Sequence, residues 1–246
     1  MQNLEKSREF DIFLSGETID LCVPSDENWV LEQWYRWFNN AETTRYLAQG
    51  VYPNTKVAQR KFFENLDNSK RIALLIKPKN LDCYIGVASL SSIDLVSRQC
   101  DFAMVIGKKI EGSDSLFFGM EAKCLLTEHA FETVGLERIN STQAIDLIAW
   151  QRWQILFGYQ MEGLLRKKFR KGMNAHDVIV SSCLMEDYLR VKASRKGNYW
   201  PGKKNLFELL KKIPKDGVID SLVMLLSQNQ NENLDFVISM NKNIYE

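Results

Sequence analysis

A long helix between two strands occupies the middle of this 246-residue chain. Gln99–Gly107 predicts a strand, and a polar connection follows it. Apolar side chains then recur at helical spacing as far as Phe131, and Gly135 stands where a helix C-cap glycine belongs. Glu137–Thr142 predicts the next strand. Strands that give way to a helix and return in this order indicate an α/β or α+β fold.

Further elements extend this unit on both sides. Residues 10–23 predict a strand or hairpin, and an aromatic helix opens after Pro24. Thr55 predicts the cap of a helix with Val57 on its inner side. The other expected elements are a short helix at Ala41–Leu47, strands at Arg71–Lys77 and Cys83–Leu90, a helix at Asp146–Phe157, strands at Tyr159–Phe169 and Asp177–Leu184, and short helices at Leu206–Ile213 and Val218–Leu226. We expect a mixed, mostly antiparallel sheet flanked by helices in a domain over residues 1–193, with a basic linker and helical C-terminal extension over 194–246.

The charge of the chain is unevenly distributed. Lys+Arg number 32 and Asp+Glu 31, a net charge of +1. The segment from Gly163 to Lys215 nevertheless holds fourteen Lys/Arg and four Asp/Glu, a net +10, which leaves −9 for the rest. This basic segment favours a negatively charged ligand. Because it carries no recognition element, we expect no nucleic-acid partner.

Composition also limits location and metal chemistry. No apolar run approaches the ~18 residues of a membrane helix, and the N-terminus has no signal-peptide core, so we expect no membrane partner. The five cysteines are widely spaced without a CxxC pair, and there are only two histidines, His129 and His176. This pattern indicates a cytoplasmic protein with reduced cysteines and no metal site.

Several short motifs recur in a characteristic order and spacing between Trp37 and Asp177. They are Trp37-Phe38-Asn39-Asn40, Thr44-Arg45-Tyr46-Leu47, Gly119, Glu121-Ala122, Leu125-Leu126, Ala130-Phe131-Glu132, Gly135-Leu136, Arg138-Ile139, Gly158-Tyr159, Glu162-Gly163, and Lys171-Gly172 followed by Asp177. Together these motifs resemble the GNAT acetyltransferase superfamily, in particular its RimJ/RimL-like branch. The resemblance covers roughly residues 10–193.

The resemblance implies a GNAT fold that holds acetyl-CoA, the acetyl donor, between two splayed parallel strands. The pantetheine arm would pair with the backbone of Met104, Val105, Ile106 and Gly107. The pyrophosphate would meet the turn at the start of the long helix, where free N–H groups favour anions. That turn carries Asp114 and Phe117 where the family has a basic or amide residue and a glycine. The remaining residues expected at the cofactor are Ser115, Phe117, Phe118, Gly119, Met120 and Trp150. Lys108, Lys109 and Lys123 either approach the CoA phosphates or lie on a solvated face.

Catalysis in this superfamily is direct attack of an amine on the thioester, assisted by a base and by a donor for the leaving thiolate. Asp101 begins the first splayed strand and is the candidate base. The family's leaving-group tyrosine falls at Gln154, which donates a hydrogen bond but no proton, so Tyr159 is the alternative donor. A third alternative is that the CoA thiolate leaves without being protonated.

The N-terminal aromatic segment is similar to that of the amino-sugar acetyltransferases of pseudaminic-acid pathways. The leading hypothesis is acetyl transfer to the amine of a sugar nucleotide, with Trp37, Tyr46 and Arg166 at the substrate. The alternatives are N-terminal protein acetylation and a non-catalytic CoA-binding or interaction module. A homodimer is left open.

Overall fold

The computed structural model describes residues 9–110 and 114–213, which form an eight-stranded sheet with helices on both faces. The elements are β1 (Ile12–Ser15), β2 (Ile19–Cys22), α1 (Asn28–Asn39), α2 (Lys56–Glu64), β3 (Ile72–Pro78), β4 (Gly86–Asp94), β5 (Gln99–Ile106), α3 (Asp114–Glu128) with a π-helical turn at His129–Thr133, β6 (Arg138–Ala144), α4 (Ile148–Ile155), β7 (Gln160–Lys171), β8 (Asn174–Leu184), α5 (Met185–Ser194) and α6 (Lys203–Lys212).

The strands lie in the order β1-β2-β3-β4-β5-β6-β8-β7, and every neighbouring pair except β5 and β6 is antiparallel. This confirms the expected α/β class with a mostly antiparallel sheet and one parallel pair. Gly135 has a φ of 76° after the long helix, as its predicted C-cap position requires.

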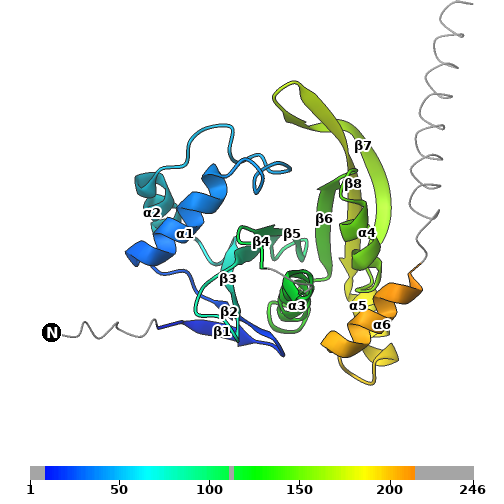
Figure 1. Cartoon of the computed structure of the whole chain (residues 1–246). Coiled ribbons are helices and arrows are strands. Elements are labelled where there is room, and N and C mark those ends of the chain that lie inside the picture. The colour runs from blue at the N-terminus through cyan, green and yellow to red at the C-terminus, as the bar shows by residue number, and fades with distance from the viewer. Residues whose placement is uncertain (1–8, 111–113, 214–246) are drawn as a thin grey trace, which may run out of the picture.

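Side chains of the first strands point alternately to the two faces of the sheet and contribute to a separate hydrophobic core on each face. Ala73 and Leu75 of β3 face α1, where they pack with Trp34 and Trp37. Leu74 and Ile76 face the other way, into the larger core around α3. The period of two along a strand therefore places α1 and α2 on one face and α3 on the other, as Figure 1 shows.

The parallel pair is short. β5 and β6 pair only between Gln99–Asp101 and Arg138–Asn140. Beyond those residues β5 continues against β4 and β6 continues against β8. The sheet therefore splits into two halves, and Figure 1 shows α3 beside the gap between them.

Three local expectations differ from the structure. Ala41–Leu47 forms turns rather than a helix: the N–H of Thr44 bonds four residues back to Asn40, but those of Arg45 and Leu47 bond only three residues back, to Glu42 and Thr44. Val57 is exposed, and Gln59 takes the inner face of α2. The helix α5 was not expected from the sequence.

The described part of the expected extension packs on the body. Tyr199 and Leu206 are buried in the same core as α3, and the Tyr199 hydroxyl donates to the carbonyl of Phe157 at 2.7 Å. The division of the chain at residue 193 stays a prediction. The helix expected at Val218–Leu226 lies outside the described residues.

Candidate active site

The described side chains near the start of α3, from Phe117 onward, lie between β5 and α6. Phe117, Phe118 and Met120 have almost no exposed surface. Gly119 faces β5 so closely that a Cβ there would lie 2.9 Å from the Met104 Cε. Because Gly119 has no side chain, α3 can approach β5 closely beside the gap. The side chain of Ser115, another residue expected at the cofactor, lies outside the described residues.

α6 completes this end of α3. The rings of Phe117 and Phe207 lie 6.4 Å apart, and the Lys203 Nζ lies 5.8 Å from the Phe117 ring centroid. A cation thus lies near the first turns of α3, where the helix dipole also favours an anion. Sequence reasoning missed Lys203 because only the packing of α6 brings it to this end of the helix.

Lys123 is fully buried, so the alternative of a solvated helix face is wrong. Its Nζ lies 3.6 Å from the ring centroid of Tyr159, 4.1 Å from that of Phe102 and 5.6 Å from that of Trp150. It donates a hydrogen bond of 2.8 Å to the Gln154 Oε1. Burial lowers the pKa of Lys123 from 10.5 to about 7.

Gln154 belongs to a closed ring of hydrogen bonds. Its Oε1 accepts from the Ser141 hydroxyl at 2.8 Å, and its Nε2 donates to the Gln143 Oε1 at 2.7 Å. The Gln143 Nε2 donates back to the Ser141 hydroxyl at 2.6 Å. The ring fixes the Gln154 amide with its oxygen toward Lys123.

Tyr159 is buried, and its hydroxyl lies 3.2 Å from the Thr127 Oγ1. Burial raises its pKa well above 10. The ring of Tyr159, rather than its hydroxyl, thus faces the Lys123 ammonium. Trp150 lies half-buried on α4 with its ring edge-to-face on Trp153 at 6.1 Å.

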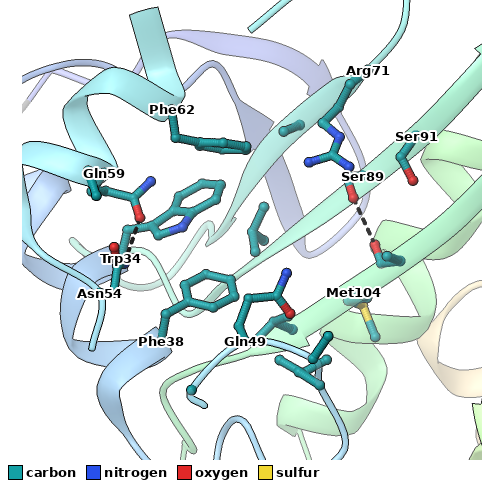
Figure 2. Close-up of a pocket in the computed structure, with 18 of the residues that line it drawn as sticks. Trp34, Phe38, Gln49, Asn54, Gln59, Phe62, Arg71, Ser89, Ser91 and Met104 are labelled. Carbon is teal, nitrogen blue, oxygen red and sulfur yellow. Dashed lines mark hydrogen bonds between the residues drawn. The ribbon is translucent and has the colours of Figure 1, made fainter. Parts of the chain in front are cut away.

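A cavity of about 430 Å³ lies on the other face of the sheet, between the α1–α2 segment and strands β3, β4 and β5. Figure 2 shows Trp34, Phe38 and Phe62 along one side and Arg71 and Ser89 on the other. We call this cavity the aromatic pocket. Its lining residues are Trp34, Phe38, Leu47, Ala48, Gln49, Gly50, Tyr52, Pro53, Asn54, Ala58, Gln59, Phe62, Arg71, Ala73, Val87, Ser89, Ser91, Ala103, Met104 and Val105.

The polar side chains of the aromatic pocket are one arginine and neutral amide and hydroxyl groups, with no acidic residue among them. Gln59 is 4% exposed, and its Oε1 accepts from Asn54 at 2.9 Å, while its Nε2 has no hydrogen-bond partner among the described residues. Arg71 lies against the Phe62 ring, with its Cζ 5.9 Å from the centroid. No Asp or Glu is among the lining residues. The pocket can therefore bind a ligand with acceptor atoms and a flat or apolar face.

The expected substrate residues lie elsewhere. Trp37 is buried against Gly107 at the end of β5 and is not among the lining residues. Tyr46 lies edge-on to His176 at 6.0 Å. Arg166 is exposed on β7, beside the irregular pairing between Leu165 and Phe169. The structure brings none of the three together.

Lys171 fastens one wall of the aromatic pocket. Its Nζ donates to the carbonyls of Thr44, Leu47 and Gln49, at 2.5, 3.3 and 2.8 Å. Three carbonyls around one ammonium group hold the loop at 44–49 against the end of β7. Lys171, although part of the basic segment, therefore binds the backbone of this loop rather than an anionic ligand.

Asp101 lies on the exposed side of β5, at the last position of the parallel pair. Ala103 and Val105, two and four residues further on, line the aromatic pocket. Alternation puts all three side chains on one face of the strand, and Phe102 and Met104 toward α3. Asp101 thus faces the pocket side of the sheet at the point where the strands separate.

Comparison with known proteins agrees with this architecture. The model of the acetyltransferase (GNAT) domain family matches residues 24–152. No curated protein matches the chain. A T. thermophilus structure assigned as an acetyltransferase is 26% identical, with a TM-score of 0.59, over 76% of this chain and 95% of that one.

Two more distant structures share the fold. The Vibrio cholerae spermidine N-acetyltransferase, in complex with CoA and spermine, is 17% identical with a TM-score of 0.62, over 70% of this chain and 98% of its own. The microcin C7 self-immunity acetyltransferase MccE, in complex with acetyl-CoA and AMP, is 19% identical with a TM-score of 0.56, over 69% and 93%. Because the family model covers just over half of the chain and the sheet has the expected split parallel pair, the chain belongs to the GNAT acetyltransferase family and uses acetyl-CoA as its donor.

Proposed function

We propose that this enzyme acetylates the amine of a nucleotide-linked amino sugar that binds in the aromatic pocket. The observation that carries the proposal is the chemistry of the lining: aromatic rings, an arginine and an orphaned buried amide, with no carboxylate. Sugars and bases bind on aromatic faces, and a guanidinium pairs with phosphate oxygens. An oxygen of the ligand would satisfy the Gln59 Nε2, whose burial without a partner is costly.

The gap between β5 and β6 and the start of α3 fit the donor. Within the described part of the chain, the backbone of Met104–Ile106 has no partner strand on the gap side, and we propose that it pairs with the pantetheine arm. The N–H of Gly107 already donates to the Ile85 carbonyl at 2.9 Å, so only its carbonyl is offered there. Bound acetyl-CoA supplies a thioester carbonyl open to attack by an amine.

The same lining disfavours a polyamine acceptor. A polyamine carries several ammonium groups, and each needs carboxylates or cation-accepting oxygens when it leaves water. The aromatic pocket has only neutral amide and hydroxyl oxygens to offer a cation, and it holds Arg71 but no Asp or Glu. This sets the chain apart in acceptor chemistry from an enzyme that binds spermine.

The Arg71→Ala variant tests the acceptor class. We expect thiol release from acetyl-CoA with UDP-linked amino sugars. In the variant, the KM for the sugar nucleotide should rise about 10- to 100-fold, which corresponds to the ~1.5–3 kcal/mol of a charge-assisted hydrogen bond. The KM for the free amino sugar and the calorimetric affinity for acetyl-CoA should not change. Arg60→Ala removes an exposed arginine of α2 outside the lining and is the matched control.

Two outcomes contradict this proposal. Efficient acetylation of N-terminal peptides, with sugar nucleotides inert, would support the alternative of N-terminal protein acetylation. An equal rise in KM for charged and neutral sugars would show that Arg71 shapes the pocket without pairing with phosphate.

We further propose Asp101 as the base that takes the proton of the acceptor amine, directly or through water. An Asp101→Asn variant should keep its acetyl-CoA affinity and lose about 10²-fold in kcat, the lower range for general-base catalysis. Glu186→Gln, at an exposed carboxylate of α5, should be unaffected. Near-full turnover in Asp101→Asn across pH would remove Asp101 from this role.

Within residues 9–110 and 114–213, no helix combines the length and apolarity needed to cross a bilayer. We propose a cytoplasmic location, as the reduced cysteines suggest.

A further inference from the structure

Lys123 lies where the two halves of the sheet part. Phe102, whose ring its ammonium group contacts, is the first β5 residue beyond the parallel pair. Ser141, which shares the Gln154 oxygen with Lys123, is the first β6 residue beyond it. The Nζ is thus flanked by both strands at the closed end of the gap that receives the donor.

This lysine is not held as a structural ion pair. It is 1% exposed, and among the described residues no carboxylate bonds to it. The titratable groups that influence it are three buried thiols, those of Cys183, Cys124 and Cys100, together with the Tyr159 phenol under its Nζ. Lys192, by contrast, pairs with both Glu128 and Glu132 on the protein surface. Burial of an unpaired ammonium group destabilises a fold, so its presence points to a functional role.

Other groups near the closed end are poorly suited to give up a proton. The Gln154 amide carries no acidic proton, and all its hydrogen-bonding atoms are engaged in the ring with Ser141, Gln143 and Lys123. The Tyr159 hydroxyl faces Thr127 on the far side of its ring. Burial raises the pKa of each of the three thiols. Burial lowers that of Lys123 to about 7, below the ~8.5 of an ordinary thiol, so transfer from Lys123 to a thiolate is downhill.

We propose that Lys123 is the proton donor to the sulfur of CoA as it leaves. The acceptor amine forms a C–N bond to the acetyl carbon, and the C–S bond breaks with its electron pair on sulfur. The sulfur takes a proton from the Lys123 ammonium group, which becomes a neutral amine. The acceptor nitrogen loses one proton to a base, and an equivalent proton must return to Lys123 before the next turnover. This proposal rests on the transfer of an acetyl group from acetyl-CoA, and it holds for any acceptor amine.

The Lys123→Met variant tests the step, because methionine keeps a long flexible side chain and removes the proton. We expect an acetyl-CoA affinity within about threefold by calorimetry and a kcat lower by about 10²- to 10³-fold. Wild-type turnover should fall as the pH rises through about 7, and the variant should lose that fall. The assay uses any amine that the wild type acetylates. Lys56→Met, at an exposed lysine of α2, is the matched control.

A second measurement does not depend on turnover. With 13Cε-labelled lysine, the NMR signal lost in Lys123→Met should titrate near neutral pH in the wild type.

A titration above pH 9 would overturn the proposal. So would a folded Lys123→Met that keeps kcat within threefold, or one that keeps the alkaline fall of wild-type turnover. If Tyr159→Phe alone lost turnover, the role would pass to Tyr159. If the wild type acetylated other amines but not sugar nucleotides, only the proposed acceptor would be contradicted, and the role of Lys123 would not.

Discussion

Lys123→Met should stabilise the protein at pH 6 by on the order of 4 kcal/mol. The wild type must either bury an unpaired ammonium group or release its proton, and burial accordingly lowers the pKa of Lys123 to about 7. Methionine fills the same space among Phe102, Trp150 and Tyr159 without that cost, and its sulfur contacts rings favourably. Urea unfolding of both proteins at a series of pH values measures the difference.

The sign of this effect depends on pH. Above about 10.4 lysine is neutral in both the folded and the unfolded states, so the two proteins should be equally stable. As the pH falls from there to 7, the unfolded wild type binds a proton that the folded state does not, and the wild type loses stability. Below 7 both states are protonated and the difference is constant. An advantage of Lys123→Met that is equal at pH 6 and pH 11 would contradict the burial argument. A more stable variant with less activity is the trade-off expected at a functional site.

Gly107→Ala should destabilise the protein by about 3 kcal/mol and abolish measurable acetyl-CoA binding. A Cβ at Gly107 would overlap the indole ring of Trp37, which is buried between α1 and the sheet. The obstacle is a rigid ring, so relief requires α1 or the end of β5 to move. Because we place the pantetheine arm on β5, such a movement would disturb donor binding. Thermal unfolding and calorimetry with acetyl-CoA measure the two effects.

Gly163→Ala provides the control for the loss of a strand glycine. Gly163 lies in β7, its φ is not positive, and a Cβ there would meet no atom within 4 Å. The protein should therefore be as stable as the wild type, or slightly more so. If Gly107→Ala and Gly163→Ala had similar effects, the contact between Trp37 and Gly107 would not determine the position of β5.

Local periodicity was sufficient for most of the secondary structure, whereas the split parallel pair was implied only by the family resemblance. The periods of strands and helices can be read from residues that are close together in the sequence, so the elements from β3 to β8 could be predicted. Helix α2 shows the limit of such reasoning. Val57 is more apolar than Gln59, yet Gln59 faces inward because Asn54 and the rings of Trp34 and Phe62 form its surroundings. These residues come from different segments, and no local pattern connects them.

Lys123 could not be located from the sequence for the same reason. On a helix with one solvated face, a lysine beside Ala122 is expected at the surface. Here β5 and α4 cover the face of α3 that carries Lys123, and Tyr159 closes over it. Trp37 was expected at the substrate, but Trp34, Phe38 and Phe62 line the aromatic pocket, and Trp37 supports the strand instead.

The bridge from Lys171 to the loop at 44–49 also affects the entropy of binding. The halves of the sheet are joined by the parallel pair at one end of the gap, and Lys171 of β7 ties them again through a loop that belongs to the α1–α2 side. Together these two connections form a closed frame. Much of the conformational freedom that a ligand would otherwise have to remove is therefore lost during folding, so donor and acceptor meet a preorganised site.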